Sequence, residues 1–365
     1  MIAVVSNGMQ APRKVSSRAN LVSAFRATGA DLPYGDPLVA HGVGMEGYFW
    51  RVTDVERGRV LIALIGVNDD GAGGSWATVG LGAHPNGFLR AGALDGASAS
   101  IERLGARTDD GCFVGGPDSV HVDLGPKAQL DLKINNAVRW PRKRFGGSSW
   151  FQSIPALNQY WHPHILDGIA EGHAVIDGER WDLNGSRVYA EKNWGRGGFP
   201  VAWWWGQAQG FADPDACVCF AGGRVESGPL GVEVTALVIN AGGQFLRLGD
   251  PILSPVKAEV SDEHWLLKSR SARWEVVVEG EAPLGGAHVL PVPLPAERRN
   301  IAAALEHLGG RMRVEVRRRG GEVVWSGTSM LAGLEHGGRE RAESEAARRG
   351  GRPDGAAGPV GPLPE

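Results

Sequence analysis

The sequence predicts an all-β chain that folds into two antiparallel barrel or sandwich units, with one short helix. The 365 residues include 55 Gly and 22 Pro, which favour turns, and many short valine-rich runs lie between them. In residues 311–317, Met312, Val314 and Val316 alternate with charged side chains, as expected of a strand with one buried and one wet face. Short strands and turns repeated in this way are typical of sandwiches and barrels.

The first half of the chain opens with one weak helical pattern and continues with strands. The helix is expected over residues 17–28, ending at Gly29. Strands are expected over residues 47–52, 59–66, 75–81, 98–104, 119–124 and 130–135. Residues 173–176 and the run from Glu179 form a hairpin around Asp177-Gly178, a strong turn signal. The turn Asn184-Gly185 then leads into a strand over residues 187–194.

The second half repeats the pattern and predicts the domain organisation. Strands are expected over residues 216–225, 231–240, 244–248, 256–260, 265–268 and 273–279. Residues 296–308, between Pro295 and Gly309-Gly310, predict the one short helix. Residues 337–365 have little apolar content and predict a disordered tail. The domains are therefore an extension over 1–35, β units over 36–195 and 196–336, and the tail over 337–365.

The composition of the chain limits its possible binding partners and its expected cellular compartment. A net charge of −3 offers no basic field to nucleic acid. The three cysteines fit a reducing compartment, and no signal peptide is expected, so the predicted location is cytoplasmic. The longest apolar runs are far too short to span a membrane. The basic run over residues 140–144 is a solvated loop or a peripheral contact with anionic lipid.

The most informative stretch is residues 189–209, Y-A-E-K-N-W-G-R-G-G-F-P-V-A-W-W-W-G-Q-A-Q. Strand alternation places Tyr189, Glu191 and Asn193 on one face. Lys192 and Trp194 then share the opposite face. In the second run, the side chains on one face are those of Trp203, Trp205, Gln207 and Gln209. A carboxyl group, amides and indole walls around one cavity suit a large apolar ligand with a few polar groups.

These residues also carry a family resemblance. E-K-N-W-G, followed by F-P and W-x-W-x-Q, resembles the signature of the tocopherol cyclase family. The segments E-G-Y-F-W at 46–50, residues 150–164, Gly178-Glu179 and T-S-M at 328–330 resemble further family segments in the same order. The resemblance covers roughly residues 40–336. It implies paired lipocalin-like, calycin-type domains, a group that also includes carotenoid hydratases.

The resemblance implies closure of a chromanol ring from a prenylated hydroquinone, a hydrophobic small molecule, with no cofactor. The alkene must be protonated by an acid whose pKa is raised in a dry site, and aromatic faces must stabilise the cation. Water must be excluded, because it would trap the cation as an alcohol. The candidate catalytic residues are Glu191, Glu46, Lys192, Asn193 and His164. The candidate substrate-binding residues are Tyr48, Trp50, Trp150, Tyr189, Trp194, Trp203, Trp205 and Gln207.

Several alternatives remain open from the sequence. Glu191 could instead form a buried ion pair that ties the two units together. His162 and His164 lie at metal-ligand spacing, but Pro163 separates them and no third ligand is apparent, so no metal is expected. The function could also be hydration by the same protonation step, or non-catalytic binding of a lipid or pigment.

Overall fold

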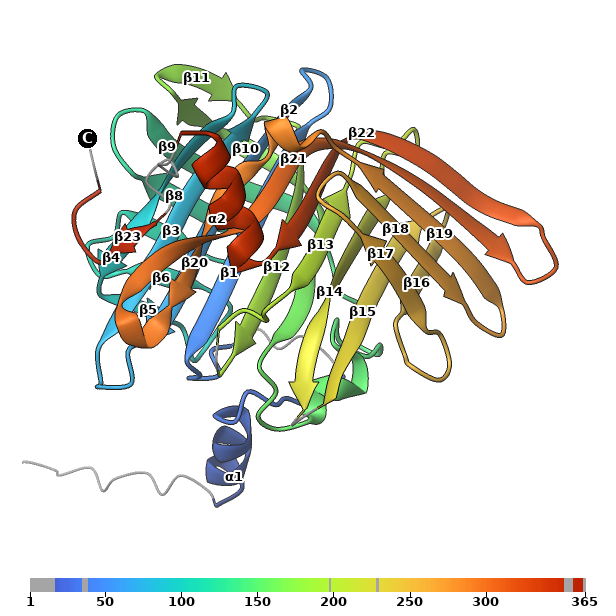
Figure 1. Ribbon diagram of the computed structural model, residues 1–365, viewed down its shortest axis with the longest axis horizontal. Coiled ribbons are helices and arrows are strands. Elements are labelled where there is room, and N and C mark those ends of the chain that lie inside the picture. Colours follow the sequence, from blue (N-terminus) through green and yellow to red (C-terminus); the bar gives the residue numbers. More distant parts are fainter. Residues whose placement is uncertain (1–16, 35–38, 197, 228–229, 351–356, 364–365) are drawn as a thin grey trace, which may run out of the picture.

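The computed structural model describes residues 17–34, 39–196, 198–227, 230–350 and 357–363, and it is dominated by two antiparallel sheets (Figure 1). The helices are α1 (Ser17–Arg26) and α2 (Arg339–Arg348), with 3-10 turns η1 (Ser149–Ser153), η2 (Leu284–Gly286) and η3 (Pro295–Glu297). The all-β prediction and the lipocalin-like architecture are confirmed. Neither helix is long and apolar enough to cross a membrane.

The first sheet runs in the order β4-β3-β2-β1-β12-β10-β9-β8-β7-β6-β5, with β11 paired to β10. Its strands are β1 (Met45–Asp54), β2 (Arg59–Asp69), β3 (Ser75–His84), β4 (Phe88–Asp95), β5 (Ala97–Ala99), β6 (Ala106–Thr108), β7 (Phe113–Gly115), β8 (Ser119–Asp123), β9 (Ala128–Arg139), β10 (Tyr160–Ile176), β11 (Glu179–Asp182) and β12 (Arg187–Gly195). The predicted hairpin turn joins β10 to β11. Asp177 (φ 50°) and Gly178 (φ 85°) are both left-handed there, as a two-residue turn between twisted strands requires.

The second sheet runs in the order β16-β15-β14-β13-β22-β21-β19-β18-β17, with β20 and β23 paired to β21. Its strands are β13 (Trp203–Ala208), β14 (Cys217–Ser227), β15 (Leu230–Ala241), β16 (Gln244–Leu248), β17 (Val256–Val260), β18 (His264–Arg270), β19 (Trp274–Glu281), β20 (His288–Leu294), β21 (Arg299–Arg318), β22 (Val323–Gly337) and β23 (Gly358–Pro359). The two sheets lie side by side in Figure 1.

Each sheet encloses its own apolar core, and further clusters join the two. Trp50 and Phe113 belong to the first core, whereas Trp204 and Phe220 belong to the second. Between the sheets, Ile62 of β2 packs with Val292 of β20 and Ile301 of β21. A second joining cluster brings Tyr189 and Trp161 of the first sheet against Trp205 of the second. The outer faces of β1, β2 and β12 are therefore buried against the second sheet.

The predicted helix over residues 296–308 is wrong. Only Pro295–Glu297 form a short 3-10 turn, and the chain then continues as β21. The Ala- and Leu-rich sequence favours a helix locally, but β20 and β22 hydrogen-bond to the two edges of this segment. Strand β10 begins at Tyr160 and passes through Pro163 with a register shift.

The predicted disordered tail is wrong for the described part of residues 337–365. Helix α2 lies against β21, and its Ala342 is buried with Leu305 and Ala302. After α2, β23 pairs with the start of β21, and the amide of Gly361 donates to the carbonyl of Ala93 in the first sheet. A few alanines suffice because the helix needs only a narrow apolar stripe. Residues 351–356 and 364–365 of the predicted tail lie outside the described residues.

Candidate active site between the two sheets

A cavity of about 100 Å³ lies between the outer face of the first sheet and the second sheet, not inside either apolar core. Strands β1, β2 and β12 form one wall, including Phe49, Leu64 and Glu191. Strands β13, β20, β21 and β22 form the other, including Trp205 and Leu290. The lining is mainly apolar, and the carboxyl groups within it are therefore unusual.

Two rows of directly paired residues position these carboxyl groups. On the first sheet, Phe49 pairs with Glu191 across β1 and β12. On the second sheet, Trp205 of β13 pairs with Glu335 of β22, which in turn pairs with Glu306 of β21. Directly opposed residues in antiparallel strands project to the same face. One row thus presents an acid beside a phenyl ring, and the other presents an indole and two acids.

Glu191 is buried, and its carboxyl group is held by three donors. The hydroxyl of Tyr189 donates to Oε2 at 2.6 Å, and the indole N–H groups of Trp161 and Trp205 each donate to the same oxygen at 2.8 Å. Burial raises the pKa of Glu191, and the three donors only partly oppose this effect. No cation within bonding distance neutralises this carboxyl group in the described structure, so the alternative of an ion pair at Glu191 is wrong.

Glu306 and Glu335 face the same cavity. Burial raises the pKa of Glu335 to about 7, although the indole of Trp203 donates a hydrogen bond to its Oε1. Burial and the neighbouring charge of Glu335 raise the pKa of Glu306 well above its ordinary value. Oε1 of Glu306 is buried and has no hydrogen-bond partner among the described residues. Burial thus favours the neutral acid form of both groups.

Arg51 supplies a buried positive charge beside this cluster. Its guanidinium donates to Oε1 of Gln207 at 2.9 Å and to the carbonyl of Leu308 at 2.8 Å, and it also donates to the carbonyl of Leu331. Burial lowers the pKa of Arg51 to about 10, and it remains protonated at neutral pH. Its charge opposes the rise in the pKa of Glu306. Arg51 thus links the two sheets and occupies Gln207, which was predicted to bind substrate.

The second predicted acid, Glu46, belongs to a separate ion pair on the other face of β1 and β12. Nζ of Lys192 lies 3.0 Å from Oε2 of Glu46 and 3.1 Å from Nδ1 of His41, and it donates to the carbonyl of Val39 at 2.8 Å. Burial alone would raise the pKa of Glu46, but the charges of Lys192 and His41 outweigh it and hold the pKa below its ordinary value. A carboxylate held ionised in this way is a poor proton donor. Neither Glu46 nor Lys192 borders the cavity.

The other predicted catalytic residues divide between the cavity and the interior. Asn193 borders the cavity, and its Oδ1 is buried without a partner among the described residues. His164 is fully buried away from the cavity, and neither of its ring nitrogens has a partner in the described structure. Burial, followed by the neighbouring His162, lowers the pKa of His164 well below its ordinary value, so it is neutral. The structure therefore brings Asn193, but not His164, to the site.

Of the aromatic residues that were predicted to bind substrate, some lie at the cavity and others do not. Trp205 borders the cavity, and Tyr189 and Trp203 bind two of its acids. Tyr48 also borders it, although its hydroxyl donates to Glu46 at 3.3 Å. The remaining three lie elsewhere: Trp50 in the first core, Trp194 stacked on His41, and Trp150 partly exposed against Phe151.

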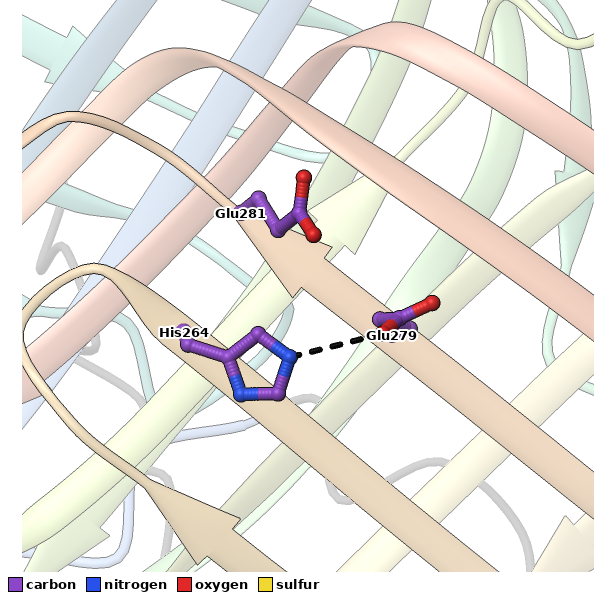
Figure 2. Close-up of side chains that lie close together, drawn as sticks. All are labelled: His264, Glu279 and Glu281. Atoms are coloured by element: carbon purple, nitrogen blue, oxygen red, sulfur yellow. Dashed lines mark hydrogen bonds and ion pairs between the residues drawn. The ribbon is translucent and has the colours of Figure 1, made fainter.

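A separate group of potential metal ligands lies on β18 and β19, outside the cavity lining. His264, Glu279 and Glu281 have ligand atoms within 4.8 Å of one another, and Figure 2 shows their side chains converging over the two strands. Nε2 of His264 lies 3.5 Å from Glu279, and Arg311 donates to Glu281 at 2.6 Å. A cation would have to compete with Arg311, and none of these residues borders the cavity.

Sequence reasoning missed Glu306, Glu335, Arg51 and the role of Trp161. Glu306 is the single acid in the run I-A-A-A-L-E-H-L at 301–308, and Glu335 follows the apolar run L-A-G-L. A lone carboxyl group within an apolar run is a usable signal once the run is assigned to a strand. Assigning residues 296–308 to a helix concealed this signal.

The tocopherol cyclase-like family model matches residues 109–338. Two curated relatives, the probable chloroplastic tocopherol cyclase of Oryza sativa subsp. japonica and the chloroplastic tocopherol cyclase of Zea mays, are 27% and 26% identical over 206 residues. These matches cover 54% of this chain and 43% of each relative, so the chain spans less than half of their length. The crystal structure of CghA with Sch210972 shares the fold, with a TM-score of 0.55 and 11% identity over 86% of this chain and 97% of that chain. Since the family model spans more than half of the sequence and carries the central Glu191 stretch, the chain belongs to the tocopherol cyclase-like family.

Proposed function

We propose that the cavity between the sheets catalyses an acid-initiated ring closure on a prenylated hydroquinone. The observation that supports this reaction best is the buried carboxyl group of Glu191, which borders an apolar cavity and has a raised pKa. A protonated carboxyl group in a dry site is the acid that an alkene requires. The membership of the chain in the tocopherol cyclase-like family supports the same class of chemistry.

In the proposed reaction, the proton of Glu191 passes to the less substituted carbon of the alkene. The tertiary cation that results is stabilised by the π faces of Phe49 and Trp205, whose rings lie 5.3 Å apart in an edge-to-face arrangement. The phenol oxygen then attacks the cation, and a carbon–oxygen bond closes the chromanol ring. The three donors to Glu191 stabilise the carboxylate left behind, which lowers the barrier to proton transfer.

The size of the cavity sets a condition on binding. About 100 Å³ is smaller than the roughly 300–1,000 Å³ typical of pockets for small molecules. A prenylated ring therefore enters only if bordering side chains such as Phe49, Phe199 or Leu290 move apart. The apolar lining leaves little room for bulk water, which favours ring closure over hydration.

The test is incubation of the purified protein with a prenylated hydroquinone, followed by separation of the products by mass and chromatography. A cyclic product of unchanged mass supports ring closure, whereas a product heavier by one water supports hydration. Quenching of tryptophan fluorescence without any product would support binding alone and refute the catalytic proposal.

The matched variants are Glu191→Gln and Glu171→Gln. Glu191→Gln keeps the shape and the acceptor oxygen but removes the acidic proton, so turnover should fall at least about 100-fold. Glu171 lies exposed on β10 near Lys133, and its variant should match the wild type. Full turnover in Glu191→Gln would show that another group is the acid.

A further inference from the structure

The proposed reaction uses Glu191 as its acid but gives no role to two further buried acids, Glu306 and Glu335. Burying a carboxyl group destabilises a protein unless the group is neutral or paired. Here two such groups occupy directly opposed positions on β21 and β22 and border the same cavity as Glu191. Packing alone would be served better by apolar side chains of the same size, so the pair indicates a chemical role.

The two acids differ in their hydrogen bonding. Trp203 donates to Glu335, which favours its ionised form, whereas Oε1 of Glu306 has no partner among the described residues. The charges that act on the pair come from four strands: Arg51 on β1, Glu191 on β12, and the two glutamates themselves on β21 and β22. A pair of this kind holds one proton between two carboxyl groups, because both cannot ionise at close range.

The indole of Trp205 joins the pair to Glu191. Trp205 is the direct cross-strand neighbour of Glu335, and its N–H donates to Glu191 at 2.8 Å. Glu191 also acts electrostatically on both glutamates and raises the pKa of each. A proton gained on one side of the cavity therefore changes the proton affinity on the other side.

We propose that Glu306 and Glu335 act as the base of the ring closure, taking the proton that the phenol loses and returning it to Glu191. The inference rests on the proposed function, because it assigns the second proton of that same reaction. Breaking the O–H bond of Glu191 forms the new C–H bond and leaves a carboxylate. Attack by the phenol oxygen forms the C–O bond, and the phenol proton passes to the carboxylate of Glu335. Transfer of one proton from the pair to Glu191 restores the starting state, so atoms and charge balance without a further reactant.

The test compares Glu306→Gln, Glu335→Gln and the control Glu315→Gln by turnover and by infrared spectroscopy. Glutamine resembles a protonated glutamate in shape, so both cavity variants should keep the fold, which circular dichroism checks. Glu315 lies on β21 outside the cavity and binds Arg317 at 2.6 Å, so its variant should be unaffected.

The proposal expects a specific pattern in the kinetics. Loss of the base should lower kcat at least about 100-fold in Glu335→Gln with little change in KM, because the glutamine oxygen can still accept from Trp203. The rise of wild-type kcat with pH near 7 should disappear in this variant. Wild-type turnover and an unchanged pH profile in both cavity variants would overturn the proposal.

Infrared spectra taken without substrate test the pair independently. The wild type should show a carboxylic acid band that disappears as the pH rises through about 7, and Glu335→Gln should lack this transition. An unchanged transition in Glu335→Gln would overturn the assignment of that proton. If the wild type forms no product from any prenylated hydroquinone, the reaction itself fails. If the wild type is active and both Glu306→Gln and Glu335→Gln behave like it, the reaction stands and only the assignment of the base fails.

Discussion

Replacing Lys192 with Met should destabilise the protein strongly while leaving the chemistry of the cavity intact. The ammonium group is buried and lies 3.0 Å from Glu46, 2.8 Å from the carbonyl of Val39 and 3.1 Å from His41. Removing it leaves the carboxylate of Glu46 buried with hydrogen-bond donors but no cation. Breaking a buried ion pair by removing one partner costs about 3–5 kcal/mol. This cost is a large part of the roughly 5–15 kcal/mol that stabilises an ordinary domain.

The assay is urea unfolding followed by tryptophan fluorescence, applied to Lys192→Met, Glu46→Gln and the double variant. The double variant should recover part of the loss, because the neutral glutamine no longer requires a cation. Turnover per folded molecule should stay within a few-fold of the wild type, since Lys192 points away from the cavity. A loss of stability below about 1 kcal/mol would refute the ion-pair reasoning. If Lys192→Met lost turnover but kept its full stability, Lys192 would have a catalytic role.

Three further predictions address the acids and the packing around them. Trp205→Phe removes one hydrogen bond to the carboxylate of Glu191, so the pKa of Glu191 should rise further and the pH–rate profile should shift to higher pH; an unshifted profile would contradict this bond. Glu335 has an ordinary pKa of 4.5 and a folded pKa of about 7, so the stability it contributes at low pH should be lost as the pH rises between these values. Between pH 4 and pH 8, the free energy of unfolding of the wild type should change by about 3 kcal/mol relative to that of Glu335→Gln. The same change with pH in both proteins would refute this prediction. Gly115→Ala would place a methyl group 2.3 Å from the ring of Trp50, and this overpacking should cost about 1–3 kcal/mol, measured as a lower Tm; an unchanged Tm would show that the ring can shift.

Strand alternation was sufficient to predict the faces of the central stretch. Tyr189, Glu191 and Asn193 do share one face, because the first two are bonded to each other and the third borders the same cavity. Lys192 lies on the opposite face as predicted, in its ion pair with Glu46. This rule depends only on local backbone geometry, so it holds wherever the strand is correctly assigned.

The composition of the cavity could not be predicted in the same way. Glu306 lies in an Ala- and Leu-rich run whose local preference is helical, and only pairing with β20 and β22 makes it a strand. Which glutamate meets Lys192 depends on the register between β1 and β12, where Tyr48 opposes Lys192 and Glu46 opposes Trp194. Such contacts are long-range, and no periodicity within one segment specifies them.

The indole of Trp205 belongs to the second sheet, yet it holds the carboxyl group of Glu191 on the first. A fragment ending at Gly195 would carry Glu191 without Trp205, Glu306 or Glu335, and water would reach the carboxyl group. In that fragment Glu191 would titrate as an ordinary surface acid and would be ionised at neutral pH. The acidity that the proposed reaction requires thus depends on the contact between the two halves, and loosening of this contact would abolish proton donation before either half unfolds.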